Sequence, residues 1–84
     1  MIRKTITLKC AEGLEARPIA MLVQKASQFS SIVHIEVGNR KVNAKSIMGM
    51  MSLNVANGDQ LVVVTDGADE DAAAQELEMY LSTQ

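Results

Sequence analysis

The segment Leu61-Val62-Val63-Val64-Thr65 constrains the fold most strongly, because it is a continuous run of aliphatic and β-branched residues. Such a run is typical of a strand in the middle of a sheet that is buried on at least one side. Turn-forming residues bound it, with Asn57-Gly58-Asp59 before the run and Gly67 after it. The segment therefore predicts a central strand on which the rest of the chain packs.

Three further strands are predicted from alternation of apolar and polar residues. Residues 2–10 place Ile2, Ile6, Leu8 and Cys10 on one face and threonines and charges on the other, with Lys4 as a misfit on the apolar face. Residues 33–37 alternate in the same way, and Gly38-Asn39 tolerates the positive φ of a hairpin turn. A short strand over residues 40–43 then returns beside them.

Helical spacing predicts three helices. Pro18 suits a first helical turn, and a helix of roughly a dozen residues follows it. One face of this helix carries an apolar stripe formed by Ile19, Leu22, Val23, Ala26 and Phe29. A second, short helix begins near Ser46. The acids of Asp69-Glu70-Asp71 suit the positive end of a last helix, whose inner stripe is formed by Ala73, Leu77, Tyr80 and Leu81.

The predicted element order is β-α-β-β-α-β-α over a single domain, residues 1–84. This order favours an α+β open-faced β-sandwich, in which a four-stranded, mainly antiparallel sheet carries three helices on one face. The core must be aliphatic, because the chain has one Phe, one Tyr and no Trp.

The composition argues against several classes of function. A net charge of −2 lacks the basic footprint of nucleic-acid binding or of a polybasic membrane surface. No apolar segment approaches the ~20 residues of a membrane span, and the first residues lack the apolar region of a signal peptide. Cys10 is the single cysteine, so no intrachain disulfide can form, and we expect a cytoplasmic protein.

The chain offers few groups for catalysis. His34 is the single histidine, and its place between Val33 and Ile35 predicts an exposed surface residue. A nucleophilic pair of Cys10 and His34 has no local support, and a metal site lacks a second histidine or a cysteine pair. No phosphate-binding glycine loop or hydrolase motif occurs. We therefore expect no enzymatic activity, no catalytic residue, no cofactor and no metal.

The segment Lys45-Ser46-Ile47-Met48-Gly49-Met50-Met51 points to a binding function instead. Ser46 is placed to cap the short helix, and a phosphate on its hydroxyl would meet unpaired backbone N–H groups. The simpler alternative is an ordinary helix cap. Helical spacing puts Met50 and Leu53 inside and leaves an adaptable apolar patch exposed, formed by Ile47, Met48 and Met51. The alternative for these methionines is that they only fill the core.

A second segment, Gly13-Leu14-Glu15-Ala16-Arg17-Pro18, has the same layout at the start of the first helix. The helix dipole and Arg17 favour a carboxylate at Glu15. The simple reading of Glu15 is a helix-start acid without further function.

These two segments resemble the HPr family, the phosphocarriers of the bacterial sugar phosphotransferase system. Gly13-Leu14-Glu15-Ala16-Arg17-Pro18 and Asn43-Ala44-Lys45-Ser46-Ile47-Met48-Gly49 lie at the family's separation, and the likeness covers essentially the whole chain. The family has its phospho-accepting histidine where this chain has Glu15. The chain therefore resembles most the catabolite repression HPr (Crh) subgroup, which lacks that histidine and commonly has glutamine there.

The resemblance implies that a serine kinase/phosphorylase modifies Ser46 and that a LacI-type catabolite control protein then binds the product. It implies the following partner-binding residues: Glu15, Arg17, Ala20, Lys45, Ile47, Met48 and Met51. Binding to enzyme I and to the sugar-specific transport components is expected to be weak or absent. The alternative is a phosphocarrier, natural or engineered, in which Glu15 replaces the histidine and could form an acyl phosphate.

Overall fold

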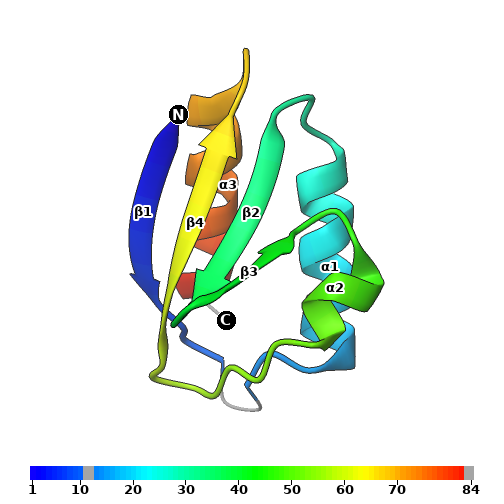
Figure 1. Ribbon diagram of the computed structural model, residues 1–84, viewed down its shortest axis with the longest axis vertical. Coiled ribbons are helices and arrows are strands. Elements are labelled where there is room, and N and C mark those ends of the chain that lie inside the picture. The colour runs from blue at the N-terminus through cyan, green and yellow to red at the C-terminus, as the bar shows by residue number, and fades with distance from the viewer. Residues whose placement is uncertain (11–12, 83–84) are drawn as a thin grey trace.

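The computed structural model describes residues 1–10 and 13–82 and contains one four-stranded sheet (Figure 1). The strands are β1 (Ile2–Thr7), β2 (Ile32–Val37), β3 (Arg40–Asn43) and β4 (Gln60–Asp66). Their order in the sheet is β1-β4-β2-β3, and each neighbouring pair is antiparallel. The apolar run 61–65 thus lies in a central strand, as its composition predicted.

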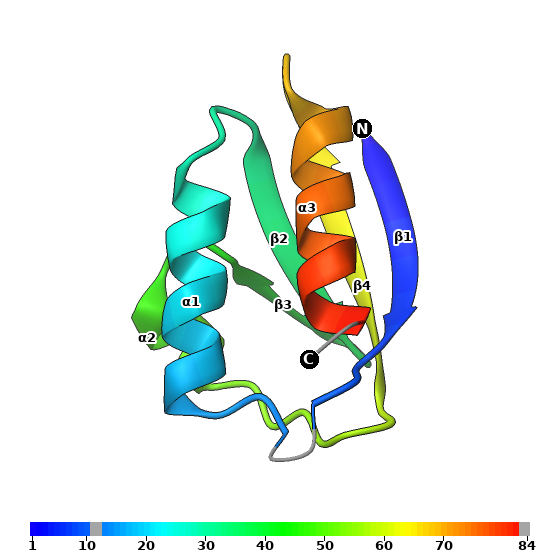
Figure 2. The same cartoon turned by 180° about the vertical axis from the view of Figure 1, so that it is seen from behind.

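The helices leave one face of the sheet open. α1 (Ala16–Ser27) and α3 (Glu70–Ser82) run side by side across the other face, as Figure 2 shows. The short helix α2 (Ile47–Met51) packs against α1 and β3 at the edge of this layer. The predicted α+β open-faced sandwich with its βαββαβα order is confirmed.

The core between the sheet and the helices is aliphatic. Its largest fully buried apolar side chains come from every layer: Leu8, Leu22, Ile35, Met50, Leu61 and Leu77. Lys4, the polar residue on the apolar face of the first strand, lies in the edge strand β1. Its Nζ donates to Glu78 Oε1 of α3 at 2.9 Å. The ammonium thus reaches a carboxylate while the stem of the side chain stays half-buried.

Two element ends differ from the sequence prediction. β1 ends at Thr7, because its partner β4 begins at Gln60, opposite Thr7. Beyond that point the chain continues through loop contacts, and Leu8 N donates to Asp59 O at 2.9 Å. α1 ends at Ser27, so Phe29 lies beyond the helix and is only half-buried. Both ends depend on contacts with distant segments, which local periodicity does not encode.

Two side chains are also buried to a different degree than expected. His34 is half-buried rather than exposed, because the central strand and β3 flank it at Val64 and Asn43. Tyr80 lies at the rim of the core rather than within it, and its hydroxyl donates to Pro18 O at 3.2 Å. No helix formed by residues 1–10 and 13–82 has the length and apolar character needed to cross a membrane.

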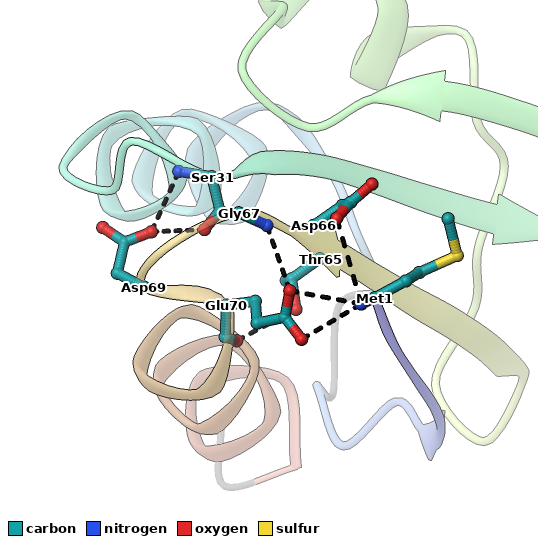
Figure 3. A network of polar contacts seen from close by, with 7 residues as sticks. All are labelled: Met1, Ser31, Thr65, Asp66, Gly67, Asp69 and Glu70. Carbon is teal, nitrogen blue, oxygen red and sulfur yellow. Dashed lines mark hydrogen bonds and ion pairs between the residues drawn. The ribbon is translucent and has the colours of Figure 1, made fainter.

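A polar network closes the end of the molecule where α3 begins (Figure 3). Asp69 accepts hydrogen bonds from Ser30 N and Ser31 N, each at 2.9 Å, and from the Ser31 hydroxyl. These bonds lower the pKa of Asp69 from 3.8 to about 2, and the bond from the Ser31 hydroxyl has the largest effect. The network therefore ties the start of α3 to the start of β2.

The neighbouring Glu70 extends this network to β1 and β4. Its Oε1 accepts from Gly67 N at 3.1 Å, and its Oε2 lies 3.1 Å from the ammonium of Met1. The bond from Gly67 is the main cause that lowers the pKa of Glu70. Gly67 has a φ of +155°, and a Cβ there would lie 2.7 Å from atoms of Ser31. Only glycine fits this turn.

Candidate functional site

Ser46 is the N-cap of α2. Its backbone is extended, and its Oγ accepts a hydrogen bond from Gly49 N at 3.2 Å. The carbonyl of Ser46 accepts from Met50 N at 3.0 Å, which begins the helical hydrogen bonding. The ordinary cap predicted for the unmodified chain is therefore present, and the serine side chain remains partly exposed.

The turn before Ser46 is held by Asn43, a residue that the sequence analysis did not single out. Asn43 Oδ1 accepts from Lys45 N at 2.8 Å, and Asn43 O accepts from Ser46 N at 3.1 Å. An asparagine two residues before the donor is the signature of an Asx turn, so the signal was present in the sequence. The turn sets the direction from which Ser46 enters the helix.

Lys45, one of the implied partner-binding residues, makes an internal contact through its ammonium. Its Nζ donates to the Phe29 carbonyl at 2.6 Å, next to the C-terminal end of α1. A cation is favoured at that end of a helix, where carbonyl groups lack partners. The structure thus places Lys45 between α1 and α2, with its ammonium in an internal contact.

α2 divides its apolar residues between core and surface as the helical spacing predicted. Met50 is fully buried and Leu53 is 5% exposed. The apolar patch consists of Ile47, Met48 and Met51, which are 48%, 84% and 57% exposed. Exposed methionines are adaptable contact residues, because the thioether chain is flexible and polarisable. A helix of five residues that exposes three large apolar side chains is a docking candidate.

Glu15 is the N-cap residue of α1, and its side chain makes no capping hydrogen bond. Leu14 N donates to Val55 O at 2.8 Å, which fixes the preceding loop against residues 54–57. Together these segments line an open depression of about 540 Å³. Arg17 is exposed on the first turn of α1. Among residues 1–10 and 13–82 no ion pair joins Arg17 to Glu15, although the sequence suggested that Arg17 favours this carboxylate.

The groups considered for catalysis are not assembled. Cys10 is buried, and its Sγ donates to Gly13 O at 3.1 Å. His34 lies on the open side of β2, between Asn43 and Val64. The described part of the chain holds no cluster of three or more His, Cys, Asp or Glu side chains suited to a metal ion. The exposed groups of the two helix starts are the Glu15 carboxylate, the capping hydroxyl of Ser46 and the apolar patch.

Comparison with known proteins identifies the family. The sequence matches the family described as "PTS HPr component phosphorylation site" over residues 2–83. It is 43% identical to the HPr-like protein Crh of Halalkalibacterium halodurans, over 96% of both chains. It is 42% identical to Crh of Bacillus subtilis, over 96% of this chain and 95% of that one. The crystal structure of the phosphocarrier protein HPr from Bacillus anthracis superposes with a TM-score of 0.93 at 38% identity, over 96% of each chain.

These matches define the class of the protein as small HPr-like proteins of the phosphotransferase system. The chain belongs to the HPr family, and relatives named Crh match it over nearly its whole length. The family that the two helix-start segments suggested is thus confirmed.

Proposed function

We propose that this protein is a regulatory HPr-like protein of the cytoplasm whose Ser46 is phosphorylated by a serine kinase/phosphorylase. The phosphorylated form then binds a LacI-type catabolite control protein as a corepressor. One observation carries the proposal: a partly exposed capping hydroxyl stands directly before the exposed Ile47, Met48 and Met51. The high identity to proteins named Crh supports it.

The chemistry of the cap favours this reading. A phosphate on Ser46 adds about −1.5 to −2 charges and three acceptor oxygens at a helix start, where they are tolerated. Such a group pairs strongly with arginine on a partner, because charge-assisted bonds to phosphate are often bidentate. The apolar patch supplies contact area next to that charge. One surface thus combines a switchable ionic contact with a constant apolar one.

Glu15 supports a regulator over a carrier. A neutral imidazole presents a lone pair to an incoming phosphoryl group, whereas a carboxylate repels the phosphate of the donor. Glu15 is exposed and no side-chain capping bond holds it, so its charge meets any protein that approaches the start of α1. Transfer from enzyme I to the transport components is therefore absent or strongly reduced.

The alternative is a phosphocarrier that uses Glu15. The free carboxylate beside the depression at residues 13–15 and 54–57 favours it, as does the close structural match to a phosphocarrier. A carboxylate oxygen of Glu15 would attack the phosphorus of the donor's phosphohistidine. The phosphorus–nitrogen bond would break and an acyl phosphate would form on Glu15. The donor's imidazole, already protonated on its other ring nitrogen, would leave as the neutral base.

Intact-mass spectrometry separates the two proposals. In one arm the protein is incubated with ATP and the serine kinase/phosphorylase of a Crh-containing bacterium. We expect one added phosphate that maps to Ser46 and is lost in Ser46→Ala, and no added phosphate would overturn the proposal. In the other arm, phosphoenolpyruvate and enzyme I should leave the protein unlabelled. A base-labile phosphate that disappears in Glu15→Ala would establish the carrier instead.

A further inference from the structure

Lys45 is held at both ends. Its backbone N–H is bound by Asn43 Oδ1, and its Nζ donates to Phe29 O at 2.6 Å. Phe29 itself is fixed to α1, because its N–H donates to Ala26 O at 3.2 Å. A lysine on a surface ordinarily leaves its ammonium in water, since fixing the long side chain costs conformational entropy. Here the side chain is half-buried and bridges the end of α1 and the turn before α2.

This bridge matters because α2 is too short to hold its position without tertiary contacts. A helix of five residues is far below the length that is stable alone. Met50 anchors it in the core, and α2 packs on α1 and β3 (Figure 1). The Lys45 contact adds a directional polar restraint immediately before Ser46.

The partner-binding residues that the family resemblance implies lie on both helices. Arg17 and Ala20 are exposed on α1, and the apolar patch is exposed on α2. A partner that contacts both helices at once needs their relative position fixed before it binds. Phosphoryl transfer to Ser46 also needs the hydroxyl held in one place, because small misplacements of a reacting group slow transfer strongly.

We propose that Lys45 is a positioning residue that locks the Ser46 turn onto the end of α1, and that its ammonium is not itself a contact for the kinase. The proposal rests on the proposed function of Ser46. It replaces the expectation that Lys45 contacts a partner, because the ammonium is already bound inside the molecule. Phosphorylation of Ser46 then depends on Lys45 through geometry.

Steady-state kinetics of Ser46 phosphorylation tests the proposal with three variants. Lys45→Met keeps the stem and removes the ammonium, Lys45→Arg keeps a donor, and Lys41→Met removes the same charge from an exposed residue of β3. We expect Lys45→Met to lower kcat by about tenfold with little change in KM. Lys45→Arg should recover part of the loss, and Lys41→Met should behave as the wild type. A rise in KM at constant kcat in Lys45→Met would overturn the proposal, because it identifies a direct contact.

Amide hydrogen exchange gives a readout that needs no kinase. The N–H of Gly49 donates to Ser46 Oγ, so its exchange rate reports how well the hydroxyl is placed. We expect faster exchange at Gly49 in Lys45→Met than in Lys41→Met, with both variants measured below their thermal midpoints. Unchanged exchange, or changed exchange with unchanged kcat, would overturn the positioning role. A wild-type protein that takes up no phosphate would refute the proposed function, while exchange would still test the bridge.

Discussion

The starts of α2 and α3 make similar hydrogen bonds, but these bonds have different roles in the molecule. At both, an oxygen of the first side chains accepts a backbone N–H, as Ser46 does from Gly49 and Glu70 does from Gly67. At the start of α3, Asp69 also accepts from the backbone N–H groups of Ser30 and Ser31. Figure 3 shows the bonds of Ser31 to Asp69 and of the Met1 ammonium to Glu70, which join distant segments. At α2 the cap stays local, and the residues that follow it are exposed and apolar.

This difference separates a helix start held by internal bonds from one that we propose to be functional. The carboxylates of Asp69 and Glu70 hold the fold together, because they accept hydrogen bonds from internal donors. The hydroxyl of Ser46 makes one local bond and remains partly exposed beside the patch. Helix capping alone therefore does not mark a candidate site, whereas capping next to an exposed apolar surface does.

The largest effect on stability is expected within α2 itself. Met50→Ala removes a fully buried side chain and should lower the free energy of unfolding by about 2–5 kcal/mol. Met48→Ala, at 84% exposure, should change it by less than about 0.5 kcal/mol. Chemical denaturation measures both. Equal losses in the two variants would mean that the patch is part of the core.

Asp69→Asn should destabilise the protein and reduce its sensitivity to acid. The pKa of Asp69 is lowered from 3.8 to about 2. The ionised carboxylate therefore contributes fully to the free energy of unfolding at a pH above its ordinary pKa, and this contribution is lost as the pH falls through about 2. Thermal midpoints between pH 5 and pH 2 should fall less steeply in Asp69→Asn than in the wild type.

Asp71→Asn serves as the matched control, because Asp71 is an exposed acid in the first turn of α3, two residues after Asp69. It should retain the acid sensitivity of the wild type. If Asp69→Asn also retained it, the network at α3 would not depend on the ionised carboxylate.

Ser46→Ala should cost about 1 kcal/mol of unfolding free energy, because the cap bond to Gly49 is lost. Ser46→Thr keeps a capping hydroxyl and should recover most of that loss. Thermal denaturation followed by circular dichroism measures both. A threonine variant as unstable as the alanine variant would show that the cap bond contributes little.

Glu15→Gln should have the smallest effect. The carboxylate is exposed and makes no capping bond, so we expect a change in unfolding free energy of less than about 0.5 kcal/mol. Phosphorylation of Ser46 should proceed at the wild-type rate, because Glu15 belongs to the start of the other helix. A slower reaction in Glu15→Gln would show that the kinase recognises the two helix starts as one surface.

The sequence predicted those features that depend on local spacing. Alternation and the apolar run gave the strands, and helical spacing separated buried Met50 from exposed Met48. Features that depend on distant partners were missed. β1 ends where β4 begins, and Asp69 binds serines 38 and 39 residues earlier in the chain. The direction of the Lys45 ammonium likewise depends on where α1 ends.

The affinity of a LacI-type catabolite control protein for this chain tests the central claim most directly. Isothermal titration should compare the Ser46-phosphorylated protein, the unmodified protein and phosphorylated Met48→Ala. We predict that phosphorylation tightens binding by at least about tenfold and that Met48→Ala removes much of this gain. Equal affinity of the phosphorylated and unmodified forms would contradict a phosphate-controlled docking surface at α2.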